Sequence, residues 1–363
     1  MERRGSHRTL PGTHFQISNL QTITVNVIII GSGPAGCAAA ICCRQQGLKA
    51  LLVTGKEERL AYDPTLVTPS ETIHPGVRSV LLQLDAAHCI DMAMRGVYEG
   101  IQVNEQIDPL GEDRHGPWQG WHINRKIFDE ALLRTVAAQG IDVLYETTVT
   151  DLLLQEERIT GIRTSTGLEI NAAFIIDASG DKRFAGKRLR FNEVHCSPPL
   201  VAWTGIAEGL PPTHALYERK YTSFIPASSG WTWLAPEFNG RCTWTRLSIK
   251  GEHHLLPPDG LAAYSDNTKT TVWNRRWRVF RPVCTEGLLL CGDAAGVIDP
   301  AAGQGILSAL VSAGMAVKTI YACVRQPAYE SLFLAQYDDW FISDYQEKMN
   351  RLKQFYTERG ISL

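Results

Sequence analysis

The most regular pattern near the start of the chain is a run of apolar residues interrupted by glycine. Four consecutive apolar residues, 27–30, precede Gly-Ser-Gly-Pro-Ala-Gly at 31–36, and a second apolar stretch continues to residue 43. A short apolar run that ends at a glycine turn is typical of a buried strand leading into a helix. Another apolar run follows at 50–53. The pattern predicts a strand, a helix and a second strand over 24–56.

Helical spacing returns after a less regular segment. Residues 59–122 contain several prolines and glycines and show one helical stretch around 78–95. Apolar residues at 128, 131, 132 and 136 then recur every three or four positions, and Gly140 ends that helix. Strands are expected near 141–154, 158–164 and 168–176.

From about residue 188 to 282 the helical periodicity fades, and aromatic, β-branched and proline residues dominate. This composition favours an antiparallel sheet. A helix over 303–324 and an amphipathic tail over 330–357 follow. We therefore predict an α/β protein with a Rossmann-like domain, an inserted antiparallel sheet and a helical C-terminus. The predicted parts are a flexible arm (1–22), a discontinuous nucleotide domain (23–187 and 283–325), a substrate sheet (188–282) and a C-terminal helical tail (326–363).

Composition narrows the classes of function. The 363 residues carry a net charge of −2, which indicates no general attraction to nucleic acid or to an anionic membrane. Residues 1–21 lack the apolar core of a secretory signal, and the apolar runs 25–43 and 305–324 are only marginally long enough to cross a bilayer. No membrane span is predicted.

The nine cysteines are odd in number and form no CxxC pair, which fits a reducing cytoplasm. The pair His253-His254 has no third ligand at useful spacing, so no metal site is expected.

Two glycine-rich stretches carry the candidate chemistry. In the first, Gly31 allows the turn, Gly33 lets the backbone approach a diphosphate, and Gly36 lets the helix and strand pack closely. Amides at the start of the helix then face the phosphates. In the second, 287–305, a strand leads to Gly292-Asp293 and a loop of small residues. Asp293 can accept hydrogen bonds from a ribityl chain, and a nicotinamide enzyme does not need that element. The pair indicates FAD.

Four motifs in register resemble the FAD-dependent superfamily of p-hydroxybenzoate hydroxylase, the flavin-dependent halogenases and the geranylgeranyl reductases. They are the turn 31–36, the segment 120–129, Asp177-Ala-Ser-Gly180 and the segment 292–305. The resemblance implies that Arg125 lies beside the flavin, that Val149 contacts adenine, and that the loop 300–306 passes the flavin pyrimidine edge at a helix N-terminus. The implied FAD-binding residues are Gly31, Gly33, Pro34, Ala35, Gly36, Arg125, Val149, Asp177, Gly180, Asp293, Pro300, Gly303, Gln304, Gly305 and Ile306.

The second strand departs from the family pattern. Its end usually carries an acid for the adenosine ribose, whereas this chain has Thr54 there, with Lys56 nearby. A hydroxyl can bind a ribose, but a charge-assisted hydrogen bond is about twice as strong. FAD is therefore expected to be held loosely.

Two segments resemble the halogenase branch of the superfamily. The loop 69–84 resembles the halogenase "GES" loop, and 231–236 (Trp-Thr-Trp-Leu-Ala-Pro) resembles the halogenase W-x-W-x-I-P segment. The halogenase lysine is absent, because the matching stretch 97–101 reads Val-Tyr-Glu-Gly-Ile and no lysine occurs between Lys56 and Lys126. The cysteine that geranylgeranyl reductases often place near the flavin is also absent from 71–76.

These absences favour oxygen insertion through a flavin C4a-hydroperoxide. In its Ser-Glu-x-x-x-Pro loop (70–75) and in residues 118–122, the chain also resembles the flavoproteins that hydroxylate a protein-bound tryptophan during tryptophylquinone biogenesis. A halogenase, a lipid reductase and a non-catalytic flavin-binding maturation factor remain alternatives. The expected substrate is an electron-rich aromatic, either a small molecule or a group bound to a protein or carrier, with O2 as co-substrate. Electrons would come from transiently docked NAD(P)H or a partner flavin reductase. The catalytic candidates are Glu71, His74 and Trp233, with His122 behind them.

Overall fold

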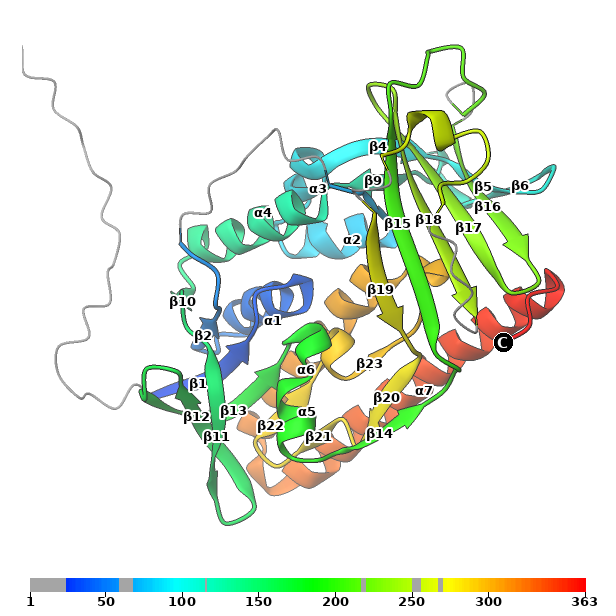
Figure 1. The fold of residues 1–363 in the computed structure, drawn as a ribbon. Helices are drawn as coiled ribbons and strands as arrows, with labels where there is room; N and C mark the ends of the chain where they lie inside the picture. The colour runs from blue at the N-terminus through cyan, green and yellow to red at the C-terminus, as the bar shows by residue number, and fades with distance from the viewer. Residues whose placement is uncertain (1–23, 59–67, 115, 217–219, 250–255, 267–269) are drawn as a thin grey trace, which may run out of the picture.

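The computed structural model describes residues 24–58, 68–114, 116–216, 220–249, 256–266 and 270–363. The predicted arm 1–22 and the pair His253-His254 lie outside these ranges. The α/β class is confirmed, with one largely parallel sheet, a second mostly antiparallel sheet and a helical C-terminus (Figure 1).

The first sheet has eight strands, and its apolar strands are buried. β1, β2, β10, β13 and β22 run parallel where they pair, whereas β11, β12 and β21 add antiparallel edges. The order along the sheet is β10 (Asp142–Leu144), β2 (Ala50–Val53), β1 (Thr24–Ile30), β13 (Glu169–Asp177), β12 (Arg158–Thr164) and β11 (Val149–Gln155), with β22 (Leu288–Leu290) on β13 and β21 (Cys284–Thr285) on β22.

Helix α1 (Pro34–Gln45) follows β1 directly, so the predicted strand–helix–strand unit is present. Pro34 at the first helical position has a fixed φ that suits a helix start. Most of α1 is buried, because α4 (Arg125–Ala138) and α6 (Gly305–Arg325) both pack against it.

Helix α6 is the one described helix that is long and apolar enough to cross a membrane, by length and composition alone. Half of its most apolar window is buried inside the protein. The core helix of a globular protein passes the same test of length and composition.

The second sheet has seven strands and includes more of the chain than 188–282. Its last two strands come from residues 100–109, so a segment expected to be irregular extends the sheet. Very short strands leave too little alternation to be read from sequence. The order is β19 (Thr271–Arg275), β15 (Leu200–Glu208), β18 (Arg241–Ile249), β17 (Gly230–Glu237), β16 (Tyr221–Ala227), β5 (Gly100–Val103) and β6 (Gln106–Pro109).

The single helical stretch expected around 78–95 is two helices in the structure. Asp85 has a left-handed backbone (φ 53°), a conformation that breaks a right-handed helix. The elements here are α2 (Gly76–Gln83), α3 (His88–Ala93) and a small sheet of β3 (Glu71–Ile73), β9 (Gly120–Ile123) and β4 (Met94–Tyr98). Similarly, the strand expected over 141–154 is interrupted at Glu146 (φ 48°) into β10 and β11.

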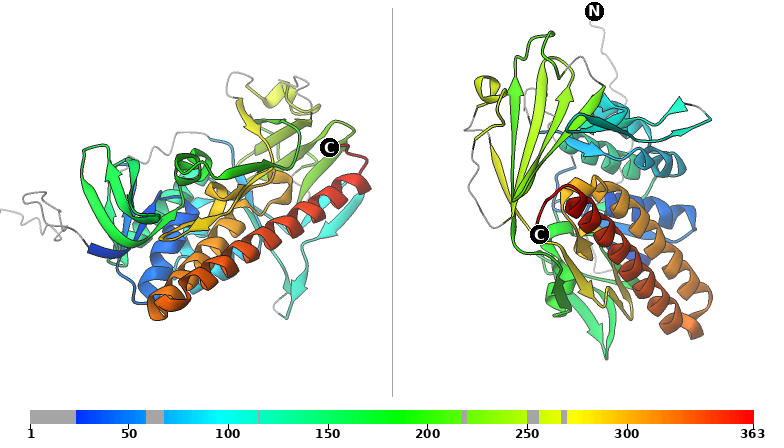
Figure 2. Two further views of the ribbon diagram at one scale, coloured as in Figure 1. Left: turned by 90° about the horizontal axis from the view of Figure 1, so that it is seen from below. Right: turned by 90° about the vertical axis from the view of Figure 1, so that its right-hand side faces the viewer.

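The longest helix, α7 (Glu330–Glu358), connects the two halves of the molecule. It lies beside α6 and ends at the seven-stranded sheet, as the two views in Figure 2 show. Leu352 and Tyr356 belong to the apolar cluster of that sheet, together with Trp231 and Phe224.

The remaining elements are short. A third sheet consists of β14 (Asn192–His195), β20 (Arg278–Arg281) and β23 (Gly296–Val297). The others are α5 (Phe184–Arg188), η1 (Gly180–Lys182), η4 (Gly292–Ala294), η5 (Pro300–Ala302), β7 (Glu112–Asp113), β8 (Gly116–Pro117), η2 (Ala262–Tyr264) and η6 (Pro327–Tyr329).

Candidate active site

The glycine turn between β1 and α1 has the shape that a diphosphate requires. A Cβ at Gly31 would lie 2.5 Å from the Ala178 carbonyl oxygen, and one at Gly36 would lie 1.8 Å from the Gly31 oxygen. These two glycines are therefore needed for packing. A Cβ at Gly33 would meet no protein atom within 4 Å. The space above Gly33 is open at the start of α1, where a phosphate group would lie.

Two helices begin without a side-chain cap near this turn. Gly33, before α1, has no side chain to cap its helix, and the Gln304 side chain, before α6, accepts no hydrogen bond from its helix. Neither first turn contains an acidic residue. The amides and the positive ends of both helix dipoles are thus available to an anion or an electron-rich group.

The two predicted carboxylates of the nucleotide site differ in their surroundings. Asp177 is fully buried and accepts hydrogen bonds from the backbone N–H of Ser179 (2.9 Å) and Ala185 (2.7 Å). Its carboxylate therefore shapes the turn that carries Gly180. Asp293 is only partly buried, and the Gly292 N–H before it is fixed by the Ser312 hydroxyl of α6 (2.9 Å). Asp293 is therefore the more exposed of the two carboxylates.

Thr54 at the end of β2 is buried and already engaged. Its hydroxyl is 2.8 Å from the Ser32 hydroxyl and accepts the Lys56 backbone N–H at 3.2 Å. A ribose would have to compete with these bonds, and loosely held FAD stays a prediction. Val149, predicted to contact adenine, is buried at the start of β11.

Arg125 begins α4 and makes two ion pairs. Its Nη1 donates to Glu71 Oε2 and its Nε to Asp129 Oδ1, both at 2.7 Å. The pair with Glu71 ties β3 to α4. Glu71 is thus charge-compensated within the protein, which favours a positioning role over proton transfer.

His74 lies at the end of β3, next to the start of α6. Its Nδ1 accepts the Gly76 N–H at 2.9 Å, and a Cβ on Gly76 would lie 3.3 Å from Leu307 of α6. Burial lowers the pKa of His74. The neutral imidazole then carries its proton on Nε2, which remains available as a donor.

Trp233 of β17 connects the seven-stranded sheet to the segment that carries Glu71 and His74. Its indole N–H donates to the Thr72 hydroxyl at 3.1 Å, and that hydroxyl is 2.9 Å from His122 Nδ1. Because the Thr72 oxygen accepts the indole proton, its own hydrogen can go to Nδ1. His122 is fully buried, burial lowers its pKa to about 3, and its Nε2 has no partner among the described residues.

Tyr98 completes this cluster. Its ring stacks on His122 with centroids 5.1 Å apart, and its hydroxyl donates to the Ile73 carbonyl at 3.1 Å. Gly120 makes room for the ring, because a Cβ there would lie 2.2 Å from Tyr98 Cε1.

A second buried network reaches the loop that begins α6. Asp299 Oδ1 accepts the Ala301 N–H (2.9 Å), and Oδ2 accepts the Trp277 indole and the Tyr356 hydroxyl, both at 2.8 Å. The Tyr356 oxygen accepts the Trp231 indole N–H at 2.6 Å. Trp233 therefore holds the loop 71–76, and Trp231 holds the loop that begins at Asp299. Both loops lie at the start of α6.

The family comparison agrees with this geometry. The profile of the family described as FAD dependent oxidoreductase matches residues 26–186, a range that contains three of the four motifs. Over these residues the chain is similar to the FAD-dependent oxidoreductases.

Related proteins show how far the likeness extends. A digeranylgeranylglycerophospholipid reductase from Methanosarcina mazei is 25% identical over 323 residues, covering 82% of this chain and 75% of that protein. The flavin-dependent brominase Bmp2 superposes with a TM-score of 0.75 at 19% identity, covering 92% and 87%. The peptidyl tryptophan dihydroxylase QhpG, essential for tryptophylquinone cofactor biogenesis, gives 0.70 at 20%, covering 93% and 76%. The two structures establish the fold of this flavoprotein.

The structure brings most of the predicted site residues together. The loop of Glu71 and His74 lies against α6, Trp233 contacts that loop, and Arg125 pairs with Glu71. Sequence reasoning missed Thr72, Tyr98, Asp299 and Tyr356. Only Tyr98 had a usable signal, because it occupies the position of the halogenase lysine.

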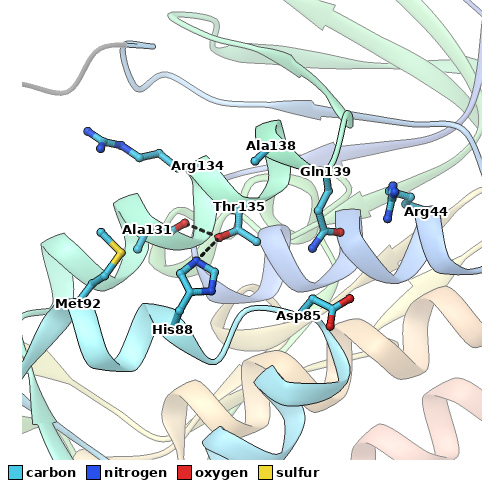
Figure 3. Close-up of a pocket in the computed structure, with 9 residues that line it drawn as sticks. All are labelled: Arg44, Asp85, His88, Met92, Ala131, Arg134, Thr135, Ala138 and Gln139. Carbon is cyan, nitrogen blue, oxygen red and sulfur yellow. Dashed lines mark hydrogen bonds between the residues drawn. The ribbon is translucent and has the colours of Figure 1, made fainter.

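A groove on the far side of α1 does not contribute to this site. It lies between the C-terminal parts of α1 and α4 and the helix α3, where His88 Nε2 is 3.2 Å from the Thr135 hydroxyl (Figure 3). No residue predicted to bind FAD lines it.

Proposed function

We propose that this flavoprotein is a monooxygenase that hydroxylates an electron-rich aromatic ring, including a tryptophan carried by a protein. Bound FAD, once reduced, would supply the activation of molecular oxygen. One oxygen atom would enter the product and the other would leave as water, with two electrons taken from the reduced cofactor. The electron source would be NAD(P)H or a partner reductase.

The residues of the chain would hold FAD and keep the site dry. Gly31, Gly33 and Gly36 would cradle the diphosphate, and the starts of α1 and α6 would face negative charge. Trp231 and Trp233 would exclude water from the space beside the flavin. The His74 Nε2–H would be a neutral donor there, and Thr72 with His122 would fix the orientation of Trp233.

Tyr98 is the observation that carries the choice of hydroxylation over halogenation. A halogenase of this superfamily resembles the present chain at 97–101 but has a lysine where Tyr98 lies. Here the hydroxyl is committed to the Ile73 carbonyl and the ring to His122. An ammonium that could direct an oxidised halide is therefore not supplied from this position.

A second candidate is reduction of a prenyl lipid. Several relatives, the M. mazei protein among them, carry a lipid reductase activity in their names. The loop 71–76 holds His74 and no cysteine, which favours hydroxylation instead.

The two candidates differ in their need for oxygen. FAD-loaded protein would be reduced with dithionite, desalted anaerobically, and mixed with oxygenated buffer containing a tryptophan-bearing peptide. Gain of an oxygen atom from labelled O2, detected by mass spectrometry, supports the proposal. A halogenated product when bromide is present, or anaerobic saturation of a geranylgeranyl lipid with no oxygenation, would contradict it.

Trp233→Phe is expected to reduce hydroxylated product about tenfold relative to flavin oxidised, because the ring loses its single hydrogen bond and its orientation. Flavin oxidation itself should continue, with hydrogen peroxide as the alternative product. Thr72→Val should have the same effect, whereas Trp273→Phe, on the exposed edge strand β19, is the matched control. Equal product yields in Trp233→Phe and wild type would argue against this role.

A further inference from the structure

A buried guanidinium lies between the two turns that carry Gly180 and Asp293. Arg278 of β20 is 5% exposed. Its Nη2 donates to the Asp293 backbone carbonyl at 3.0 Å and lies 3.4 Å from Asp181 Oδ1, while its Nε lies 3.4 Å from Glu193 Oε1. Arg278 thus connects the turns η1 and η4, which pack against each other.

One nitrogen of this group is not satisfied within the protein. Nη1 of Arg278 is buried and has no hydrogen-bond partner in the part of the chain that the structure describes. A buried donor on a charged group that lacks an acceptor is costly. Burial also lowers the pKa of Arg278, with the nearby Arg183 acting in the same direction. Arg278 Nη1 therefore lacks an acceptor. The two turns beside it, η1 and η4, carry Gly180 and Asp293, which are both predicted to bind FAD.

We propose that Arg278 is an FAD ligand whose Nη1 donates to an oxygen of the ribityl or diphosphate part of the cofactor. The inference rests on FAD binding by this chain. The two acids beside Arg278 do not depend on its guanidinium for charge compensation. Glu193 is also paired with Arg183, and the Asp181 side chain is 59% exposed to solvent. Arg278 is therefore retained at a cost to the protein without cofactor, which FAD binding would offset.

This proposal predicts opposite effects on two measurable quantities. In Arg278→Met, the melting temperature of the cofactor-free protein should not fall, because the removal of an unsatisfied donor offsets the lost bond to the Asp293 carbonyl and Glu193 keeps Arg183 as its partner. FAD affinity, from fluorescence titration, should fall about 10- to 100-fold, as expected for a lost hydrogen bond from a charged donor. Arg183→Met is the matched control and should bind FAD as wild type does.

Titration with riboflavin identifies the oxygen. A loss seen with both ligands assigns the contact to the ribityl chain, and a loss seen only with FAD assigns it to the diphosphate. Wild-type FAD affinity in Arg278→Met would overturn the inference. A joint fall in cofactor-free stability and affinity would also overturn it, since Arg278 would then only hold the turns. If wild type itself binds no FAD, the proposed function fails as well.

Discussion

Replacing Gly33 by valine is expected to abolish FAD binding while leaving the fold intact. Gly33 precedes α1 with φ −76° and ψ −175°, a conformation open to any residue. A Cβ there would meet no protein atom within 4 Å. The added methyl groups would occupy the space of the diphosphate and displace it from the amides of α1. Loss of two charge-assisted hydrogen bonds lowers affinity by at least about 100-fold.

Gly36→Ala is the contrasting variant, because its Cβ would lie 1.8 Å from the Gly31 carbonyl oxygen. It should lower the melting temperature strongly and yield poorly folded protein. Far-ultraviolet circular dichroism, thermal melting and FAD fluorescence titration distinguish the two variants. Normal FAD affinity in Gly33→Val would place the diphosphate elsewhere.

Tyr356→Phe is expected to destabilise the protein by about 2–5 kcal/mol, because it removes two buried hydrogen bonds and leaves one buried donor without a partner. The Trp231 indole N–H loses its acceptor, and Asp299 loses one of its donors. Tyr345→Phe is the control on the same helix. Its hydroxyl donates to the Val297 carbonyl at 3.2 Å and not to a buried carboxylate, so its removal should cost about 1 kcal/mol. Urea unfolding measures both values.

The effect of Tyr356→Phe should also grow with pH. Burial raises the pKa of Asp299 from 3.8 to about 6. A raised pKa in the folded state contributes stability that is present below pH 3.8 and is lost as pH rises through about 6. Above that pH the carboxylate is charged and depends on its donors. The destabilisation by Tyr356→Phe should therefore be larger at pH 8 than at pH 5. An equal effect at both values would mean that Asp299 does not titrate there.

Some of the site could be predicted because its determinants are local. Gly31 and Gly36 are fixed by a turn of six residues, and the break of each long apolar run at a glycine is visible in the sequence. The two hydrogen-bond networks of the β17 tryptophans could not be predicted, because their determinants are not local. The Asp299–Tyr356 bond joins residues 57 positions apart, and the Trp231–Tyr356 bond joins residues 125 apart. Their pairing depends on how the sheet is placed over α6.

Roles were harder to predict than positions. Glu71 and Arg125 were expected to act on substrate and flavin respectively, and they lie side by side. Their ion pair gives each a structural partner that no local pattern indicates. Asp177 similarly lies in the expected motif, but its carboxylate accepts two backbone N–H groups. A motif fixes the backbone path, whereas side-chain partners depend on neighbours from distant segments.

The bond between Tyr356 and Asp299 also sets an order of events during synthesis. The glycine turn and β13 emerge from the ribosome early, so the diphosphate half of the cleft can form while the rest of the chain is still being made. The loop at 300–305 lacks its hydroxyl donor until translation has passed Tyr356. The loop before α6 is therefore fixed by this bond only after almost the whole chain has been made.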